Sequence, residues 1–116
     1  MSESVTADEF RDLALELPEA SEGSHSGHPD FRIGGKIFAT IGPDEAWGMV
    51  KLSADRQAFW IRNLPETFEM FNGAWGRQGC TKLILAAVHA EIARQALRDA
   101  WRNVAPTQLI QRFSED

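Results

Sequence analysis

Apolar residues recur with helical spacing near both ends of the chain. Between residues 10 and 17 they follow the i, i+3, i+4, i+7 pattern, which predicts an amphipathic helix that stops at Pro18. Thr6 and Glu9 have the spacing of a capping box at its start. A second apolar stripe predicts a longer helix from Ala90 to Val104.

A hairpin is predicted where two apolar runs flank Gly34-Gly35. A two-residue type I′ turn requires a positive φ at both central positions, and glycine adopts that conformation without strain. With this turn, Ile33 is expected to pair with Lys36 and Phe31 with Phe38. The sequence therefore places two antiparallel strands on either side of these glycines.

Alternating side chains predict a further strand from Trp47 to Leu52. Trp47, Met49 and Lys51 fall on one face and Val50 on the other, although the alternation does not say which face is the core. Three further strands are expected, and Ser53 is expected to cap a short middle helix. The expected strands cover residues 21–26, 68–71 and 80–86.

These elements predict an α+β fold for one domain, residues 1–116. A single antiparallel sheet of about five strands is expected to pack against the N-terminal and C-terminal helices. The last three residues, 114–116, are expected to fray. With 43% hydrophobic and 25% charged residues, the composition is that of an ordinary globular protein.

Composition also excludes several classes of protein. The single cysteine, Cys80, excludes an internal disulfide and a cysteine-rich zinc site. No apolar stretch approaches the ~18 residues of a membrane helix, and the first ten residues do not resemble a signal peptide. We therefore expect a cytoplasmic protein with no membrane partner.

Charge is unevenly distributed along the chain. The net charge is −5, and the first 30 residues carry eight acids but only one base. This balance argues against a general polyanion-binding protein. The later part of the chain, with eleven bases and nine acids, still allows a local basic surface.

Few residues suggest chemistry. The glycine-rich segment Gly73–Gly79 lacks the Gly-Lys-Ser/Thr ending of a phosphate-binding P-loop, so its glycines are interpreted as positive-φ turn residues. Within it, Trp75 and Arg77 have the chemistry to stack on a base and to contact phosphate. The alternative, which we favour, folds Trp75 back over the core.

Catalysis and metal binding have weaker support. Cys80 lacks a pattern that links it to a histidine, so it is interpreted as a strand residue and no enzyme activity is expected. His25, His28 and Asp30 have a spacing that a metal site uses, but the surrounding glycines and proline favour polar strand or loop residues. We expect no metal and no cofactor.

Four segments together resemble one family. In order along the chain they are PDFRIGGKIFAT (29–40), VKLS (50–53), GAWGRQG (73–79) and ALRDAWRNVAP (96–106). They are similar to motifs of the MmcQ/YjbR family of small bacterial proteins, which often has tryptophan where this chain has Cys80. The resemblance implies a fold like that of CyaY-type or secretion-chaperone-type domains, and DNA binding through a double wing.

Two functional hypotheses follow. The first is a nucleic-acid-binding protein with weak, salt-sensitive affinity for DNA, and the second is a non-enzymatic adaptor that binds a small molecule or a protein partner through the sheet face. Convergence of the basic side chains on one face would favour the first, and pairing with acids the second. The candidate nucleic-acid contacts are Arg32, Lys36, Lys51, Trp75, Arg77 and Lys82.

Overall fold

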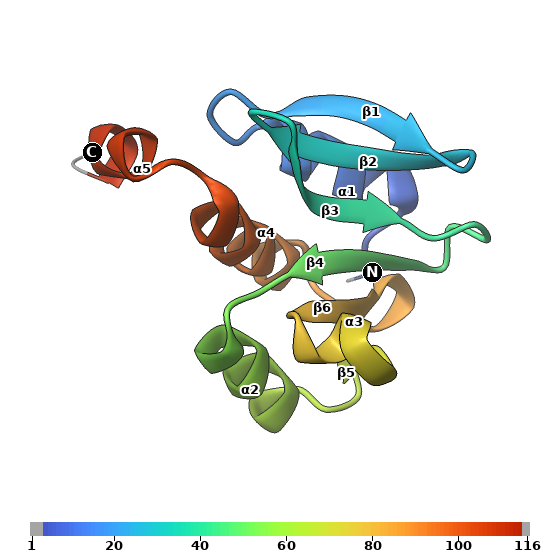
Figure 1. Ribbon diagram of the computed structural model, residues 1–116. Helices are drawn as coiled ribbons and strands as arrows, with labels where there is room; N and C mark the ends of the chain where they lie inside the picture. Colours follow the sequence, from blue (N-terminus) through green and yellow to red (C-terminus); the bar gives the residue numbers. More distant parts are fainter. Residues whose placement is uncertain (1–3, 115–116) are drawn as a thin grey trace.

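The order of strands in the antiparallel sheet is β1-β2-β3-β4-β6-β5 (Figure 1). The computed structural model describes residues 4–114, so residues 115 and 116, which were expected to fray, lie outside it. The predicted α+β class is confirmed, with six strands where about five were expected. The elements are α1 (Ala7–Leu15), β1 (Ser21–His25), β2 (His28–Ile33), β3 (Lys36–Ile41), β4 (Trp47–Lys51), α2 (Ala54–Asn63), β5 (Phe68–Met70), α3 (Gly73–Arg77), β6 (Cys80–Ile84), the 3-10 turn η1 (Leu85–Ala87), α4 (Ala90–Val104) and α5 (Thr107–Ser114).

The predicted capping box begins α1. The Thr6 hydroxyl accepts from the Glu9 backbone N–H at 3.1 Å, and the Glu9 carboxylate accepts from the Thr6 backbone N–H at 2.8 Å. These two bonds satisfy backbone donors that the first helical turn leaves without a partner. The helix then directs Phe10, Leu13 and Ala14 into the core.

The predicted glycine hairpin joins β2 and β3, but its register differs from the expectation in one place. Gly34 and Gly35 have φ values of +56° and +85°, and Ile33 pairs with Lys36 as predicted. The predicted pairing of Phe31 with Phe38 is wrong, because Phe31 lies opposite Ala39 and the register shifts between Phe31 and Arg32. A bulge adds one residue to a strand, and here both phenylalanines are fully buried.

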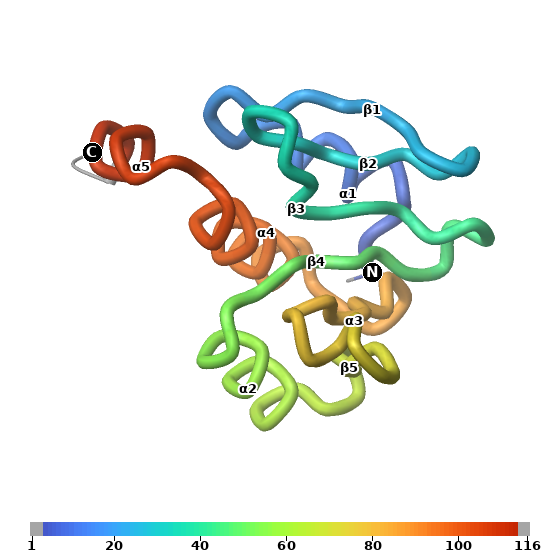
Figure 2. The backbone as a smooth tube through the Cα atoms, viewed as in Figure 1, coloured from blue at the N-terminus to red at the C-terminus, as the bar shows by residue number. Residues whose placement is uncertain are grey.

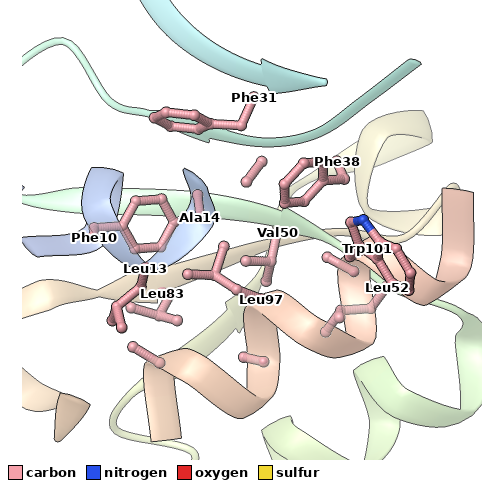
Figure 3. Packing of buried hydrophobic residues seen from close by; sticks show 14 of the residues in the cluster. Phe10, Leu13, Ala14, Phe31, Phe38, Val50, Leu52, Leu83, Leu97 and Trp101 are labelled. Carbon is pink, nitrogen blue, oxygen red and sulfur yellow. The ribbon is translucent and has the colours of Figure 1, made fainter. Parts of the chain in front are cut away.

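Helices α1 and α4 pack on one face of the sheet, where they enclose the hydrophobic core (Figures 1 and 3). Val50 is fully buried between the sheet and α4, beside Leu97 in Figure 3. Because Val50 is buried, its side of β4 is the core face, which the alternation of side chains alone did not establish. Trp47, Met49 and Lys51 must point from β4 to the opposite face of the sheet.

The opposite face, which we call the open face, carries neither α1 nor α4. The backbone trace in Figure 2 shows α4 leaving the sheet beside the end of β4 and leading into α5, which projects to one side. The side-chain amide of Asn103, near the end of α4, donates to the Lys51 carbonyl at 3.1 Å and fixes this junction. Within residues 4–114, none of the helices has both the length and the apolar composition needed to cross a bilayer.

Candidate functional site

The open face contains a trough with a volume of about 920 Å³. This volume falls in the range of ~300–1,000 Å³ that is usual for small-molecule sites. Its lining comes from strands β3 and β4, from the turns at both ends of the strands, from the segment before β6 and the first residue of β6, and from the end of α4. The lining residues are His25, His28, Gly35, Lys36, Ile37, Thr40, Ile41, Gly42, Pro43, Trp47, Met49, Lys51, Phe71, Trp75, Cys80, Asn103 and Val104.

Strand β4 supplies an ordered series of side chains along the trough. Trp47, Met49 and Lys51 share the open face, because successive side chains of a strand alternate between its faces. At ~3.3 Å per residue, Trp47 and Lys51 are separated by roughly 13 Å along the strand. The strand therefore presents an aromatic ring at one end of the trough and a cation at the other.

Aromatic rings form one part of the lining. The rings of Trp47 and Phe71 meet edge to face, with their centroids 5.5 Å apart. The Lys82 ammonium lies 5.2 Å from the Trp47 ring centroid and 5.7 Å from that of Phe71, which is cation–π geometry. A Cβ atom at Gly42 would lie 2.5 Å from the indole of Trp47, so glycine at this position allows the ring to lie against the backbone.

A short helix replaces the predicted glycine-rich loop. Gly73 and Gly79 have the predicted positive φ, whereas Gly76 lies within α3, and the prediction for it is wrong. Gly76 is required for space, because its Cβ would lie 1.8 Å from the Phe71 carbonyl oxygen. The buried Gln57 side chain holds this segment by donating to the Gly76 carbonyl and to the Thr81 hydroxyl, each at 3.0 Å.

The anchored α3 presents Trp75 to solvent at the trough. Trp75 is 68% exposed, so the interpretation that it folds back over the core is wrong. The tight contact at Gly76 and the Gln57 hydrogen bonds account for this orientation, because they attach the helix to the protein without using the indole. Trp75 is thus a large apolar surface held on a fixed backbone.

The candidate basic residues are divided among three environments. Lys36 and Lys51 line the trough, and Lys82 contacts two of its rings. Arg32 is engaged by a carboxylate, as described below. Arg77 is exposed at the end of α3 and does not belong to the lining. The structure therefore gathers three of the five cations at the trough and neutralises one.

Lys36 and Lys51 mark one end of the trough and the histidines mark the other, whereas Lys82 lies against the aromatic rings. Ala39 pairs with Val50, which places Lys36 of β3 and Lys51 of β4 at the same end of the sheet. His28 begins β2 at the opposite end, and His25 pairs with it across the β1–β2 turn. Among residues 4–114, no aspartate or glutamate belongs to the lining, so its charged and imidazole side chains are all basic.

A buried carboxylate supports the histidine end. Asp30 is 0% exposed and accepts two hydrogen bonds from Arg32, from Nε at 2.7 Å and from Nη2 at 2.9 Å. His25 Nδ1 lies 2.8 Å from the Asp30 Oδ2 atom. The hydrogen bonds from Arg32 are the main reason that the pKa of the Asp30 carboxyl is below its ordinary value, although burial opposes them.

Strand β1 leaves space for the Asp30–Arg32 ion pair. Gly23 lies opposite Asp30, and a Cβ at Gly23 would lie 3.0 Å from the carboxylate and 3.2 Å from Arg32 Nε. The Asp30 carboxylate in turn raises the pKa of the Arg32 guanidinium. Asp30 therefore remains ionised in the folded protein and holds both Arg32 and His25.

Asp30→Asn is expected to lower the free energy of unfolding by about 2–3 kcal/mol at pH 7, because it weakens charge-assisted hydrogen bonds to a buried group. A folded-state pKa below the unfolded-state value means that the ionised carboxyl stabilises the fold above the unfolded pKa of ~3.9. This stabilisation is lost as the pH falls through the folded pKa. Urea unfolding measured from pH 7 to pH 3 should show that the difference in free energy of unfolding between parent and variant becomes smaller in acid.

The exposed Asp55 provides the matched control for this prediction. Asp55→Asn is expected to change the free energy of unfolding by no more than about 0.5 kcal/mol, as for most surface substitutions. A difference between parent and Asp30→Asn that stays constant from pH 7 to pH 3 would show that the ion pair does not provide the stabilisation.

Cys80 is a residue of β6, as the sequence predicted. Its side chain is buried, and burial raises the pKa of the thiol, although the nearby Lys51 partly opposes this. The protonated thiol is a poor nucleophile. Across residues 4–114, no group of three or more histidine, cysteine, aspartate or glutamate side chains is placed to hold a metal ion.

Sequence reasoning missed the aromatic part of the trough. It assigned Trp47 to a strand face without deciding which face was buried, and it gave Phe71 no role. The signal was present in the alternation of Trp47, Met49 and Lys51, but only the burial of Val50 places these residues on the open face, where they line the trough. His25 and His28 were weighed as metal ligands and interpreted as polar strand or loop residues, so neither was assigned to a ligand site.

Comparisons with known proteins agree with the architecture. The family model described as YjbR matches residues 15–103. The crystal structure of the Deinococcus radiodurans protein DR2400, described as the family-model domain DUF419, has a similar fold, with a TM-score of 0.74. Its sequence is 17% identical, and the alignment covers 97% of this chain and 91% of that one. No curated protein matches this sequence. Because the family match includes all six strands and most of α4, the chain belongs to the YjbR family.

Proposed function

We propose that this YjbR-family chain is a non-catalytic binding protein whose trough holds a small organic anion with a flat, apolar body. The observation that carries the proposal is the lining itself, which combines aromatic rings with basic side chains and, in the described part of the chain, contains no aspartate or glutamate. Trp47, Phe71 and Trp75 offer surfaces for a flat ring system. Lys36 and Lys51 offer the opposite charge for an acidic group.

The dimensions of the trough support a small occupant. Its volume of about 920 Å³ is near the upper end of the usual range for small-molecule sites. The spacing of roughly 13 Å between Trp47 and Lys51 along β4 suits a molecule with a ring at one end and an anionic group at the other. The proposal includes no chemical step, since the Cys80 thiol is buried and has a raised pKa.

A fluorescent aromatic anion, 8-anilinonaphthalene-1-sulfonate, tests this proposal. The parent protein is expected to bind it saturably, with one site per chain and with quenching of tryptophan fluorescence. Lys36→Ala combined with Lys51→Ala is expected to weaken binding by about tenfold or more, since charge-assisted contacts contribute about 1.5–3 kcal/mol each. Circular dichroism would verify that the variant remains folded.

The control removes two cations far from the lining. Arg62 and Arg98 are exposed on α2 and α4, and neither lines the trough. Arg62→Ala combined with Arg98→Ala changes the net charge by the same amount and is expected to leave probe affinity unchanged. Equal losses in the two double variants would mean that overall charge, rather than the trough, governs binding.

Nucleic acid is the second candidate ligand, and the observation that favours it is the gathering of Lys36, Lys51 and Lys82 near an exposed Trp75. Cations beside stacking rings are characteristic of single-strand binding surfaces. The pairing of Arg32 with Asp30 and the net charge of −5 argue for weak affinity. A double-wing arrangement, with the Gly34-Gly35 hairpin as one wing, belongs to this candidate.

A labelled single-stranded oligonucleotide, measured by anisotropy at ~50 and ~200 mM salt, tests the second candidate. If phosphates are bound at the lysine end, Lys36→Ala with Lys51→Ala should flatten the log–log salt dependence by about 1.4, or ~0.7 per contact. A duplex of the same sequence is the comparison ligand. Failure of the parent to bind either at ~50 mM salt would eliminate this candidate.

A further inference from the structure

The imidazole of His25 has a fixed orientation at one end of the trough. Its Nδ1 atom lies 2.8 Å from the buried carboxylate of Asp30, whose two oxygens also accept hydrogen bonds from Arg32. A carboxylate can only accept, so Nδ1 must carry the hydrogen in this bond. In the neutral ring the other nitrogen, Nε2, then has a free lone pair and is a hydrogen-bond acceptor.

The Nε2 edge of this ring is available to a ligand. The His25 side chain is 48% exposed and lines the trough. Its ring meets His28 edge to face at 6.3 Å between centroids. Among the residues that the structure describes, no group forms a hydrogen bond with His25 Nε2. The trough therefore has a hydrogen-bond acceptor at the end opposite to Lys36 and Lys51.

We infer that His25 is a specificity-determining residue, and that its Nε2 accepts a hydrogen bond from an N–H or O–H group of the ligand. The inference rests on the proposed binding of an organic anion in the trough. It defines the ligand class further, as an aromatic acid that carries a hydrogen-bond donor at the end away from its acidic group. Asp30 is a positioning residue, because its effect on the ligand would be exerted through His25.

Two probes that differ by one amine separate this inference from the proposed function. These are 6-aminonaphthalene-2-sulfonate and naphthalene-2-sulfonate, which share the ring and the anionic group. The amine donor is expected to give the first probe about three- to tenfold higher affinity for the parent protein, the usual gain from one hydrogen bond. In His25→Phe this ratio should fall to about one, with both probes still bound.

His28→Phe is the matched control, because it replaces the neighbouring imidazole of the same lining and should leave the ratio intact. Equal affinities of the two probes for the parent would overturn the inference and leave the proposed function standing. If neither probe binds the parent, both the proposed function and the inference fail. Retention of the ratio in His25→Phe would show that the donor is not recognised by His25.

Nitrogen NMR of the histidine rings supplies a readout that does not depend on affinity. The neutral His25 ring is expected in the tautomer protonated at Nδ1, and Asp30→Asn is expected to shift it toward the Nε2-protonated form. A purely structural role of Asp30 would change stability without moving this equilibrium. An Nε2-protonated His25 ring in the parent would contradict the inference.

Discussion

Gly79→Ala is expected to destabilise the protein by about 3–5 kcal/mol, from backbone strain together with overpacking. Gly79 has a φ of +106°, which side-chain-bearing residues rarely adopt. An alanine Cβ would also lie 2.1 Å from the Leu52 carbonyl oxygen. This contact cannot be relieved by a rotamer change, because the clashing atom belongs to the backbone.

The consequence extends to the trough. The Leu52 backbone N–H donates to the Gly79 carbonyl at 2.9 Å, and this bond closes the junction between the end of β4 and the start of β6. Moving Gly79 away from Leu52 would break this bond beside the Lys51–Cys80 pair. We therefore expect weaker binding of 8-anilinonaphthalene-1-sulfonate as well as a lower unfolding midpoint in urea.

Gly34→Ala is the matched control for this prediction. Gly34 also has a positive φ, +56°, but a Cβ there would have no atom within 4 Å. Only the penalty for a side-chain-bearing residue at positive φ applies, so the free energy of unfolding is expected to fall by about 1–2 kcal/mol. Similar losses in the two variants would mean that the contact with Leu52 contributes nothing and that the conformational term alone determines the effect.

Local sequence signals predicted most of the secondary structure because each has a local physical cause. Thr6 and Glu9 satisfy each other's backbone donors within one helical turn, and Gly34-Gly35 adopts its turn without help from other elements. The register shift between Phe31 and Arg32, which leaves Phe38 as the extra residue, has no such local cause. It depends on how the Phe31 and Phe38 side chains pack in the core. The spacing of residues along one strand gives no information about that packing.

The lining of the trough was only partly predictable for the same reason. The lysines were identified as candidate contacts from their positions beside turns and on strand faces. Recognition of Arg32 as a neutralised cation required the knowledge that Asp30 lies fully buried beside it. The exposure of Trp75 likewise depends on Gln57, a residue 18 positions earlier, which anchors α3.

Trp101→Ala is expected to cost about 3–5 kcal/mol, the usual loss when a large buried aromatic side chain is removed. Trp101 is 3% exposed and lies beside Phe38 and Leu52 in Figure 3. Its indole N–H donates to the Pro18 carbonyl at 2.9 Å, which links α4 to the segment after α1. Alanine would leave a cavity and would also remove the hydrogen-bond donor to Pro18.

Two comparison variants separate these effects when unfolding is measured in urea. Trp101→Phe keeps most of the ring volume and loses the hydrogen bond, so the free energy of unfolding is expected to fall by about 1–2 kcal/mol. Trp75→Ala removes the same side chain from a position that is 68% exposed and should change the free energy of unfolding by about 0.5 kcal/mol or less. If Trp75→Ala destabilised the protein as much as Trp101→Ala, burial would not explain the role of Trp101. An unchanged midpoint in Trp101→Ala would contradict its placement in the core.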